Sequence, residues 1–264
     1  MQRPEHMNFE RWVVVAKPKS DASTRLFCFP HAGGGASAFR GWGEAAPPDL
    51  EVCTIQLPGR ENRLREPALE SISDIVRTVA DTVERFGDLP FAFFGHSMGA
   101  IIAFETAREL RRTGGTLPLS LFVSASRAPH LPWPHPPVRH LDDLGLLTEV
   151  NRRYDSVPEV ILADEELRRL LTPALRADMA LVETYGCEAE APFDFPIVAF
   201  AGDRDRMVRC LEVEQWSMQT SGPFRYRTIS GDHLFLQTKR SELLAEVTST
   251  LGLCDDRLVT PSAE

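Results

Sequence analysis

The sequence has no excess of positive charge. Among its 264 residues, 29 are Lys or Arg and 38 are Asp or Glu, which gives a formal net charge of -9 at pH 7. A general nucleic-acid binder presents a clustered basic face to the phosphate backbone. The charge balance therefore predicts that this protein does not bind nucleic acid.

The sequence also lacks the cysteine patterns of a disulfide framework or a zinc site. Its five cysteines are scattered, odd in number and form no Cys-x-x-Cys pair; they are Cys28, Cys53, Cys187, Cys210 and Cys254. Disulfide frameworks and structural zinc sites need cysteines at paired, regular spacing. We expect free thiols in a reducing compartment and no metal centre.

Two kinds of hydrophobic segment are missing as well. Charged and histidine side chains interrupt residues 1–25, so the apolar stretch of a signal peptide is not visible there. The longest apolar runs, such as residues 119–125, are far shorter than the roughly 20 residues that a membrane-spanning helix needs. We expect a cytoplasmic protein that does not bind membranes.

What the sequence does contain is an alternation of short strand-like runs with helical patterns. Several of the runs are continuously apolar, as expected of parallel strands that are buried on both faces. Apolar residues at helical spacing predict helices over 71–86, 98–112 and 241–251. The pattern predicts one α/β domain over residues 1–264, with helices flanking a mostly parallel central sheet. The expected strands are 12–16, 25–29, 51–56, 91–94, 119–124, 196–201 and 225–229.

Residues 129–192 interrupt this alternation. A proline-rich stretch over 129–137 opens the segment, no strand-like run follows, and helical patterns appear at about 141–153 and 164–185. Ordinary crossover helices are one interpretation, but a single crossover rarely needs this much chain. Insertions at strand ends often carry function. We therefore expect a helical lid above the functional site.

The pentapeptide Gly-His-Ser-Met-Gly at residues 95–99 follows a buried-strand pattern and precedes a helical one. This strand–turn–helix setting is the one that a nucleophile elbow requires. Gly95 and Gly99 leave the room that so tight a turn needs, and a helix N-terminus favours negative charge developing beside Ser97. A serine that only caps the helix is the alternative. The setting predicts a serine hydrolase of the α/β-hydrolase fold with Ser97 as its nucleophile.

The general base is expected after Ser97, because this fold orders its triad as serine, acid and histidine. His233 follows the last predicted strand and precedes the last predicted helix, where the fold delivers its base. The other histidines after Ser97 lie in the proline-rich region, before the last core strands; they are His130, His135 and His140. The position in the chain therefore predicts that His233 is the base.

The triad acid is expected on the loop after the predicted strand 196–201. Two aspartates compete there, Asp203 and Asp205. We favour Asp205, because Gly-x-x-Asp with an apolar residue three positions later, here Val208, is the usual pattern; Asp203 stays open as the alternative. The acid would hold the tautomer of His233 and stabilise the imidazolium that forms during the reaction.

The oxyanion hole of this fold takes one backbone N–H from the residue after the nucleophile, here Met98. The second comes from the loop after an earlier strand, which here reads Pro-His-Ala-Gly-Gly-Gly over 30–35. We choose the N–H of Ala32, with His31 and Gly33 as alternatives. Such a loop could instead cradle a phosphate, but neither Gly-x-Gly-x-x-Gly nor Gly-x-x-x-x-Gly-Lys is present.

Taken together, several segments resemble those of bacterial type II thioesterases, the stand-alone editing enzymes of polyketide and nonribosomal peptide synthesis. The resemblance spans roughly residues 25–251 and rests on residues 29–34, 56–63, 94–100 with 104–105, 124–129 and 231–235. Thioesterase domains fused to synthases typically place the acid after the strand that follows the elbow helix. Residues 124–127 carry no carboxylate there, which favours the stand-alone type. One departure is Arg206, where a proline is common.

This resemblance implies hydrolysis of acyl groups from the phosphopantetheine arm of carrier proteins, through an acyl-enzyme and without metal or organic cofactor. It implies a phosphopantetheinylated acyl or peptidyl carrier protein as partner and a cytoplasmic location beside a polyketide or nonribosomal peptide synthase. Two other activities would use the same triad. One is a small-molecule carboxylesterase or lipase, and the other is an acyltransferase in which an alcohol or amine replaces water.

Docking of a carrier protein would need a local basic surface, because carrier proteins are generally acidic and so is this chain. Arginines cluster after one predicted strand and along the expected lid. A solvated surface balanced by nearby glutamates is the alternative interpretation. The candidates are Arg60, Arg63, Arg65, Arg152, Arg153, Arg168, Arg169 and Arg176.

Overall fold

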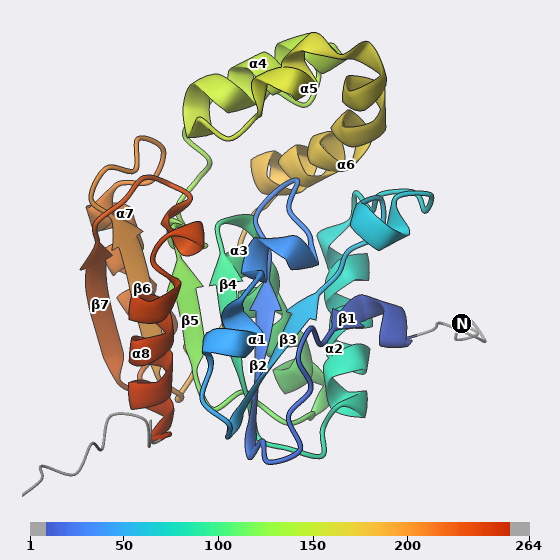
Figure 1. The fold of residues 1–264 in the computed structure, drawn as a ribbon. Coiled ribbons are helices and arrows are strands. Elements are labelled where there is room, and N and C mark those ends of the chain that lie inside the picture. The colour runs from blue at the N-terminus through green and yellow to red at the C-terminus, as the bar shows by residue number, and fades with distance from the viewer. Residues whose placement is uncertain (1–8, 254–264) are drawn as a thin grey trace, which may run out of the picture.

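The computed structural model describes residues 9–253 and contains one seven-stranded sheet (Figure 1). The strand order is β1-β3-β2-β4-β5-β6-β7, and every neighbouring pair is parallel except β1 with β3. The mostly parallel sheet expected from the sequence is confirmed. The strands are β1 (Val13–Val14), β2 (Thr24–Phe29), β3 (Leu50–Ile55), β4 (Phe91–His96), β5 (Leu121–Ser124), β6 (Ile197–Gly202) and β7 (Phe224–Ile229).

Six of the seven expected strands lie within two residues of their predicted ends, but the first is shorter. It was expected over 12–16, whereas β1 comprises only Val13 and Val14. Trp12 belongs instead to a 3-10 turn, and β1 is the edge strand, paired only with β3. An edge strand forms backbone hydrogen bonds with a neighbour on one side only, so fewer of its residues are fixed in the extended conformation.

Helices cover both faces of the sheet because successive residues of a buried strand point to opposite sides. In β4, Phe93 joins a core with residues of α2 (Ile72–Arg85) and α3 (Met98–Thr113). Its neighbour Phe94 joins the opposite core, with α1 (Trp42–Ala45) and α8 (Arg240–Leu251). The two helical layers are visible in Figure 1.

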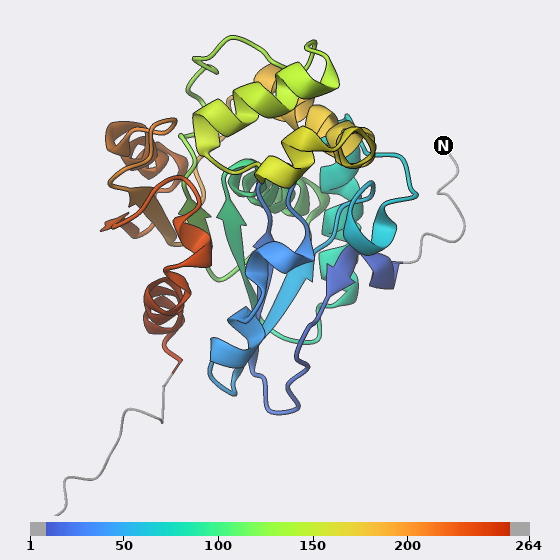
Figure 2. The ribbon, with the colours of Figure 1, turned by 45° about the horizontal axis from the view of Figure 1, so that its top comes forward.

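The segment 129–192, which we call the insertion, stands above the carboxyl ends of the strands (Figure 2). It contains α4 (Asp143–Tyr154), α5 (Glu159–Ala163) and α6 (Glu165–Thr184), and no strand. Its helices share a small core of their own, which includes Leu146, Leu147, Val150, Leu175 and Met179. The partly buried Ala32, from the loop after β2, packs against this core. The insertion therefore rests on the loop in which the oxyanion donor was predicted.

The short helix α7 (Cys210–Glu214) follows the loop after β6. Neither α7, nor α1, nor α5 was expected, because four or five residues are too few to show a helical period. Within residues 9–253, no helix has the length and apolar character needed to cross a bilayer.

Candidate active site

Ser97 lies in a tight turn between β4 and α3. Its φ is 55°, a left-handed value that a non-glycine residue adopts only under constraint. A Cβ at Gly95 would lie 2.4 Å from the backbone of Ala100, and a Cβ at Gly99 would lie 2.0 Å from the carbonyl oxygen of Phe29. Both positions therefore require glycine. The Ser97 side chain makes no cap hydrogen bond, which removes the alternative of a simple helix cap.

The side chains of Ser97, His233 and Asp205 form a hydrogen-bonded chain. His233 Nε2 lies 3.0 Å from Ser97 Oγ, and His233 Nδ1 lies 2.7 Å from Asp205 Oδ2. A carboxylate only accepts, so Nδ1 carries the proton and Nε2 is free to accept the proton of Ser97. The three residues come from the ends of β4, β6 and β7, which meet at one edge of the parallel sheet. The geometry suits a serine nucleophile activated by a histidine.

The two aspartates after β6 have different positions. Asp205 has a fully buried side chain, and its Oδ1 accepts from the N–H groups of Met207 and Val208 at 2.8 and 3.1 Å. Asp203 is 42% exposed, and its Oδ1 accepts from the N–H of Gly231 at 2.8 Å. Asp203 thus braces the loop that carries His233, while Asp205 contacts the imidazole itself.

The loop after β2 borders the same pocket as Ser97. Ala32, Met98 and Ser97 line one pocket, so both predicted donor residues of the oxyanion hole lie beside Ser97. The N–H of Gly33 donates to Asp178 Oδ2 at 2.7 Å. Gly33 is therefore already occupied, which favours Ala32 over that alternative.

Asp178 on α6 joins the insertion to this loop. It accepts from Gly33 and also forms a two-pronged ion pair with Arg60, at 2.5 and 2.9 Å. The Asp178 side chain is fully buried and that of Arg60 is 5% exposed. Arg60 also donates to the carbonyl of Gly34 at 3.2 Å. This pair ties three segments together around the predicted oxyanion loop.

His96, inside the elbow, is fully buried and has a partner on each ring nitrogen. Its Nε2 lies 2.9 Å from the carbonyl oxygen of His233, so Nε2 must donate; its Nδ1 then accepts from Ser124 Oγ at 2.9 Å. Burial and, second, the nearby His233 hold the pKa of His96 well below its ordinary value. His96 is therefore neutral and supports the backbone of His233 rather than acting as a base.

His31 also borders the site, and its ring contacts that of His96. Burial, followed by the charges of His233 and Arg60, lowers the pKa of His31 to about 4. His31 is therefore neutral at pH 7. It does not repel the positive charge that would form on His233 when that residue takes a proton. These contacts indicate that His31 packs, and His96 packs and hydrogen-bonds, beside the site without acting as its base.

The pocket at Ser97 is predominantly apolar and lies between α3 and the insertion. From the core side it is lined by Met98, Ile101 and Ile102, and from the insertion by several residues that include Met179 and Val182. The ring of Tyr154, at the end of α4, lies 4.8 Å from that of His233. An apolar cavity with few polar groups is typical of a site for an apolar organic substrate.

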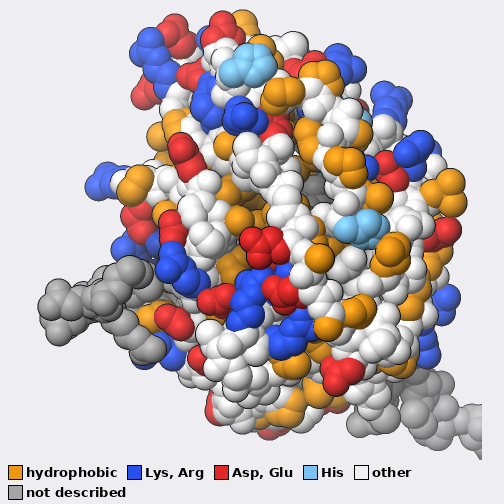
Figure 3. Space-filling model, turned by 180° about the vertical axis from the view of Figure 1, so that it is seen from behind, with side chains coloured by type: hydrophobic (Ala, Val, Ile, Leu, Met, Phe, Trp, Pro, Cys, Tyr) orange, Lys and Arg blue, Asp and Glu red, His pale blue; other side chains and the backbone are white. Residues whose placement is uncertain are grey.

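Most of the arginines that we considered for docking do not form a basic surface. Arg60 and Arg63 are buried in ion pairs with Asp178 and Glu66, and the buried Arg153 pairs with Glu149. The long aliphatic stems of arginine pack well when a carboxylate neutralises the guanidinium. The more exposed Arg152, Arg169 and Arg176 pair with carboxylates as well. On the face shown in Figure 3, basic and acidic side chains are likewise intermixed.

Three residues near the site were not singled out from the sequence: Asp178, Tyr154 and Tyr185. Tyr154 and Tyr185 line the pocket, whereas Asp178 meets its partner Arg60 across 118 positions of the chain. No local sequence pattern indicates a contact between residues so far apart. The only signal was the position of Asp178 as a lone acidic residue on the apolar side of a helical pattern.

Comparison with known proteins places this geometry in a familiar setting. The family model described as "Thioesterase domain" matches residues 24–251. The gramicidin S biosynthesis protein GrsT of Aneurinibacillus migulanus is 41% identical over 243 residues, which are 92% of this chain and 94% of that protein. Thioesterase PikA5 of Streptomyces venezuelae is 40% identical over 264 residues, covering 98% of this chain and 93% of that protein.

Solved structures show the same likeness. The RedJ thioesterase of the prodiginine pathway in Streptomyces coelicolor superposes with a TM-score of 0.82 at 38% identity, covering 90% of this chain and 94% of that one. The type II thioesterase BorB of the borrelidin cluster gives a TM-score of 0.81 at 33% identity, covering 95% and 99%.

Proposed function

We propose that this chain, which belongs to the thioesterase domain family, removes acyl groups from the phosphopantetheine arm of carrier proteins. The enzyme class, a thioester hydrolase, follows from the family. The editing role in polyketide or nonribosomal peptide synthesis draws on relatives that match this chain over nearly its whole length. The observation that carries the chemistry is the hydrogen-bonded chain of Ser97, His233 and Asp205 inside an apolar pocket.

The proposed reaction has two steps. His233 takes the proton of Ser97 as Oγ attacks the thioester carbonyl, and the N–H groups of Met98 and Ala32 stabilise the oxyanion. The tetrahedral intermediate collapses, the carbon–sulfur bond breaks, and His233 returns the proton to the leaving pantetheine thiol. Water then attacks the acyl-Ser97 ester with the same histidine as base, which releases the free acid and restores Ser97. Asp205 holds His233 in the required tautomer throughout.

The insertion is proposed to act as a lid within a single α/β-hydrolase domain. Its helices form a core largely separate from the two sheet cores, and its residues complete the pocket over Ser97. A segment with its own small core opens at lower free energy than the sheet. We propose that the lid admits the acyl-pantetheine arm of an acyl or peptidyl carrier protein in the cytoplasm.

The test compares the same acyl group on three carriers. The purified chain is given acetyl or hexanoyl groups on a phosphopantetheinylated carrier protein, on coenzyme A and on N-acetylcysteamine, with product followed by intact mass. We expect the highest kcat/KM on the carrier protein and at least a thousandfold loss in a Ser97→Ala variant, because only binding and oxyanion effects then remain. Equal kcat/KM on all three carriers would argue against a carrier-protein partner. Faster turnover of oxygen esters than of thioesters would favour a carboxylesterase.

A further inference from the structure

We infer that Tyr185 limits the length of the acyl chain that the pocket accepts, and so makes the enzyme selective for short and medium chains. This inference rests on the proposed function only in taking an acyl thioester as the substrate. Tyr185 is the first residue after α6, and its side chain lines the pocket that contains Ser97. Neither the triad nor the predicted oxyanion hole involves it.

The pocket follows the first turns of α3. Met98, Ile101 and Ile102 line it, and no residue of α3 beyond Ile102 does. Opposite them, Leu181 and Val182 from the last turn of α6 form the other wall. An acyl chain attached to Ser97 would therefore lie between two apolar helix faces.

Tyr185 connects the end of α6 to α3, just beyond the part of α3 that lines the pocket. Its hydroxyl donates to Glu105 Oε1 at 2.6 Å, and Glu105 follows Ser97 by eight positions along α3. At 1.5 Å per residue, eight positions correspond to about 12 Å along the helix. The hydroxyl of Tyr185 is thus held at the level of Glu105, roughly 12 Å along α3 from Ser97 and three positions beyond Ile102, the last residue of α3 in the pocket.

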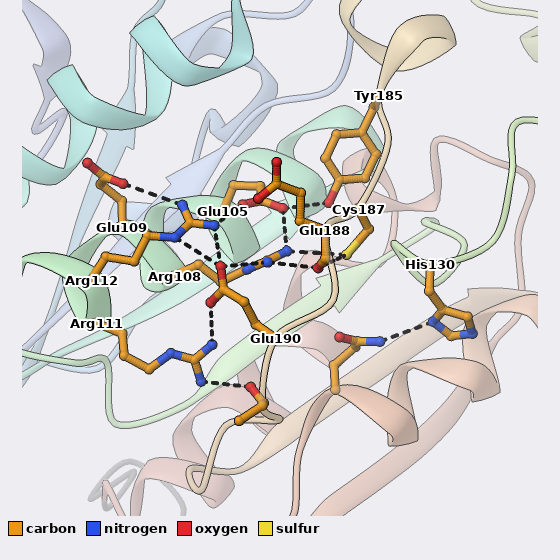
Figure 4. A network of polar contacts seen from close by, with 12 residues as sticks. Glu105, Arg108, Glu109, Arg111, Arg112, His130, Tyr185, Cys187, Glu188 and Glu190 are labelled. Carbon is orange, nitrogen blue, oxygen red and sulfur yellow. Dashed lines mark hydrogen bonds and ion pairs between the residues drawn. The ribbon is translucent and has the colours of Figure 1, made fainter.

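A network of ion pairs holds Tyr185 in this position (Figure 4). Glu105 accepts from Arg108 Nη1 at 2.9 Å. Arg108, whose side chain is 2% exposed, also binds Glu190 at 2.7 Å and the carbonyl of Glu188 at 2.8 Å. Glu188 and Glu190 lie with Tyr185 in the segment that connects α6 to β6. Moving the phenol aside would therefore remove a partner from Glu105, whose side chain is 12% exposed.

The phenol also stays neutral. Burial, followed by the charge of Glu105, raises the pKa of Tyr185 above its ordinary value. Its ring can therefore form an apolar end wall while its hydroxyl remains bonded to Glu105. The wall is rigid for a physical reason: a neutral donor whose acceptor is a partly buried carboxylate makes a strong hydrogen bond.

The position of the wall sets a chain length. An extended chain advances on the order of 1.2 Å per bond, as the peptide backbone does over its three bonds per residue. A depth of about 12 Å holds about ten such bonds. The helix rise is counted from the Cα of Ser97, so two of these bonds are the Cα–Cβ and Cβ–Oγ bonds of the serine, and the other roughly eight end at about the eighth carbon of the acyl chain. Longer chains would have to fold back or displace Tyr185.

The experiment measures kcat/KM of the full chain on N-acetylcysteamine thioesters with saturated chains of two to fourteen carbons. For the wild type we expect kcat/KM to rise to about eight carbons and to fall at least tenfold by twelve. In Tyr185→Ala we expect the ratio of kcat/KM for twelve carbons to that for four to rise at least tenfold. Tyr185→Phe keeps the ring and should keep the wild-type ratio.

Glu109→Gln is the matched control. Glu109 pairs with Arg112 on the same helix, one turn beyond Glu105, and does not line the pocket. Its chain-length profile should equal that of the wild type. Melting curves of all variants show whether each one is folded. If Tyr185→Ala unfolds, Tyr185→Leu, which also removes the ring, takes its place and should raise the same ratio; an unchanged ratio in the folded leucine variant would equally overturn the inference. A profile that shifted in Tyr185→Phe would contradict the assignment of the limit to the ring.

An unchanged ratio in folded Tyr185→Ala would overturn the inference, as would a wild-type profile without a decline beyond eight carbons. Failure of the proposed function looks different. Carrier-linked acyl groups would then be hydrolysed no better than N-acetylcysteamine thioesters, while the chain-length limit set by Tyr185 would still be measurable on the small substrates.

Discussion

Replacing Asp178 by asparagine is expected to lower the free energy of unfolding strongly and to slow the reaction only moderately. Asp178 is fully buried, and its carboxylate neutralises the 5% exposed guanidinium of Arg60. Asparagine has nearly the same shape but no charge. The variant would therefore leave the positive charge of Arg60 buried without a counter-ion.

The size of the effect follows from the burial. Removing one partner of a buried ion pair typically costs about 3–5 kcal/mol. For a chain of this size, each kcal/mol lowers the melting temperature by roughly 2–4 °C. We therefore expect Asp178→Asn to melt roughly 10 °C below the wild type, with a urea midpoint that falls in proportion.

The matched control lies on the same helix. Glu165 pairs with Arg169 across one turn of α6, and their side chains are 66% and 74% exposed. Exposed pairs of this kind contribute about 0–1 kcal/mol, so Glu165→Gln should change the melting temperature by no more than a few degrees. Equilibrium urea unfolding followed by circular dichroism compares the three proteins.

Activity measured well below the melting temperature should fall less than tenfold in Asp178→Asn. The loop after β2 keeps two other restraints, because Arg60 still donates to Gly34 and Gln56 accepts from the N–H of Ala36 at 2.7 Å. Our reasoning would be refuted if Asp178→Asn were as stable as Glu165→Gln.

Three further predictions concern the triad, the pH dependence and the lid. Asp205→Asn should reduce kcat/KM by at least a hundredfold more than Asp203→Asn, since only Asp205 contacts His233; the reverse order would assign the acid role to Asp203. His96 is neutral in the folded state but titrates near pH 6.5 when unfolded, so the unfolded chain binds the extra proton and stability falls as pH falls below 6.5. Between pH 6.5 and 5.5, His96 should lower the free energy of unfolding by about 1 kcal/mol. Urea midpoints measured across this pH range should show this loss in the wild type, and the loss should be smaller by that amount in His96→Gln. An equal dependence of stability on pH in both proteins would contradict the prediction. Amide exchange should be faster in α4 and α5 than in β4, and uniform core-like protection would count against a mobile lid.

Much of the fold was predictable because its signals are local. Buried parallel strands such as 91–94 are short apolar runs, and helices such as 71–86 repeat their apolar residues at helical spacing. The elbow is also a local signal: its two glycines stand where a Cβ would collide with backbone atoms only a few positions away or on the neighbouring strand. The short helices α1, α5 and α7 escaped prediction because they complete barely one turn.

The sequence by itself determined the type of sheet, the elbow at Ser97 and the choice of His233, since each depends on the order of residues along a strand, turn and helix. Only the tertiary structure decided which aspartate contacts His233, because Asp203 and Asp205 share one loop and differ in the direction of their side chains. Only the tertiary structure showed that Arg60 is buried against Asp178 instead of facing a partner. Arginines at a surface and in a core look alike in sequence. Whether burial of the charge is tolerated depends on a carboxylate that the fold brings from 118 positions away.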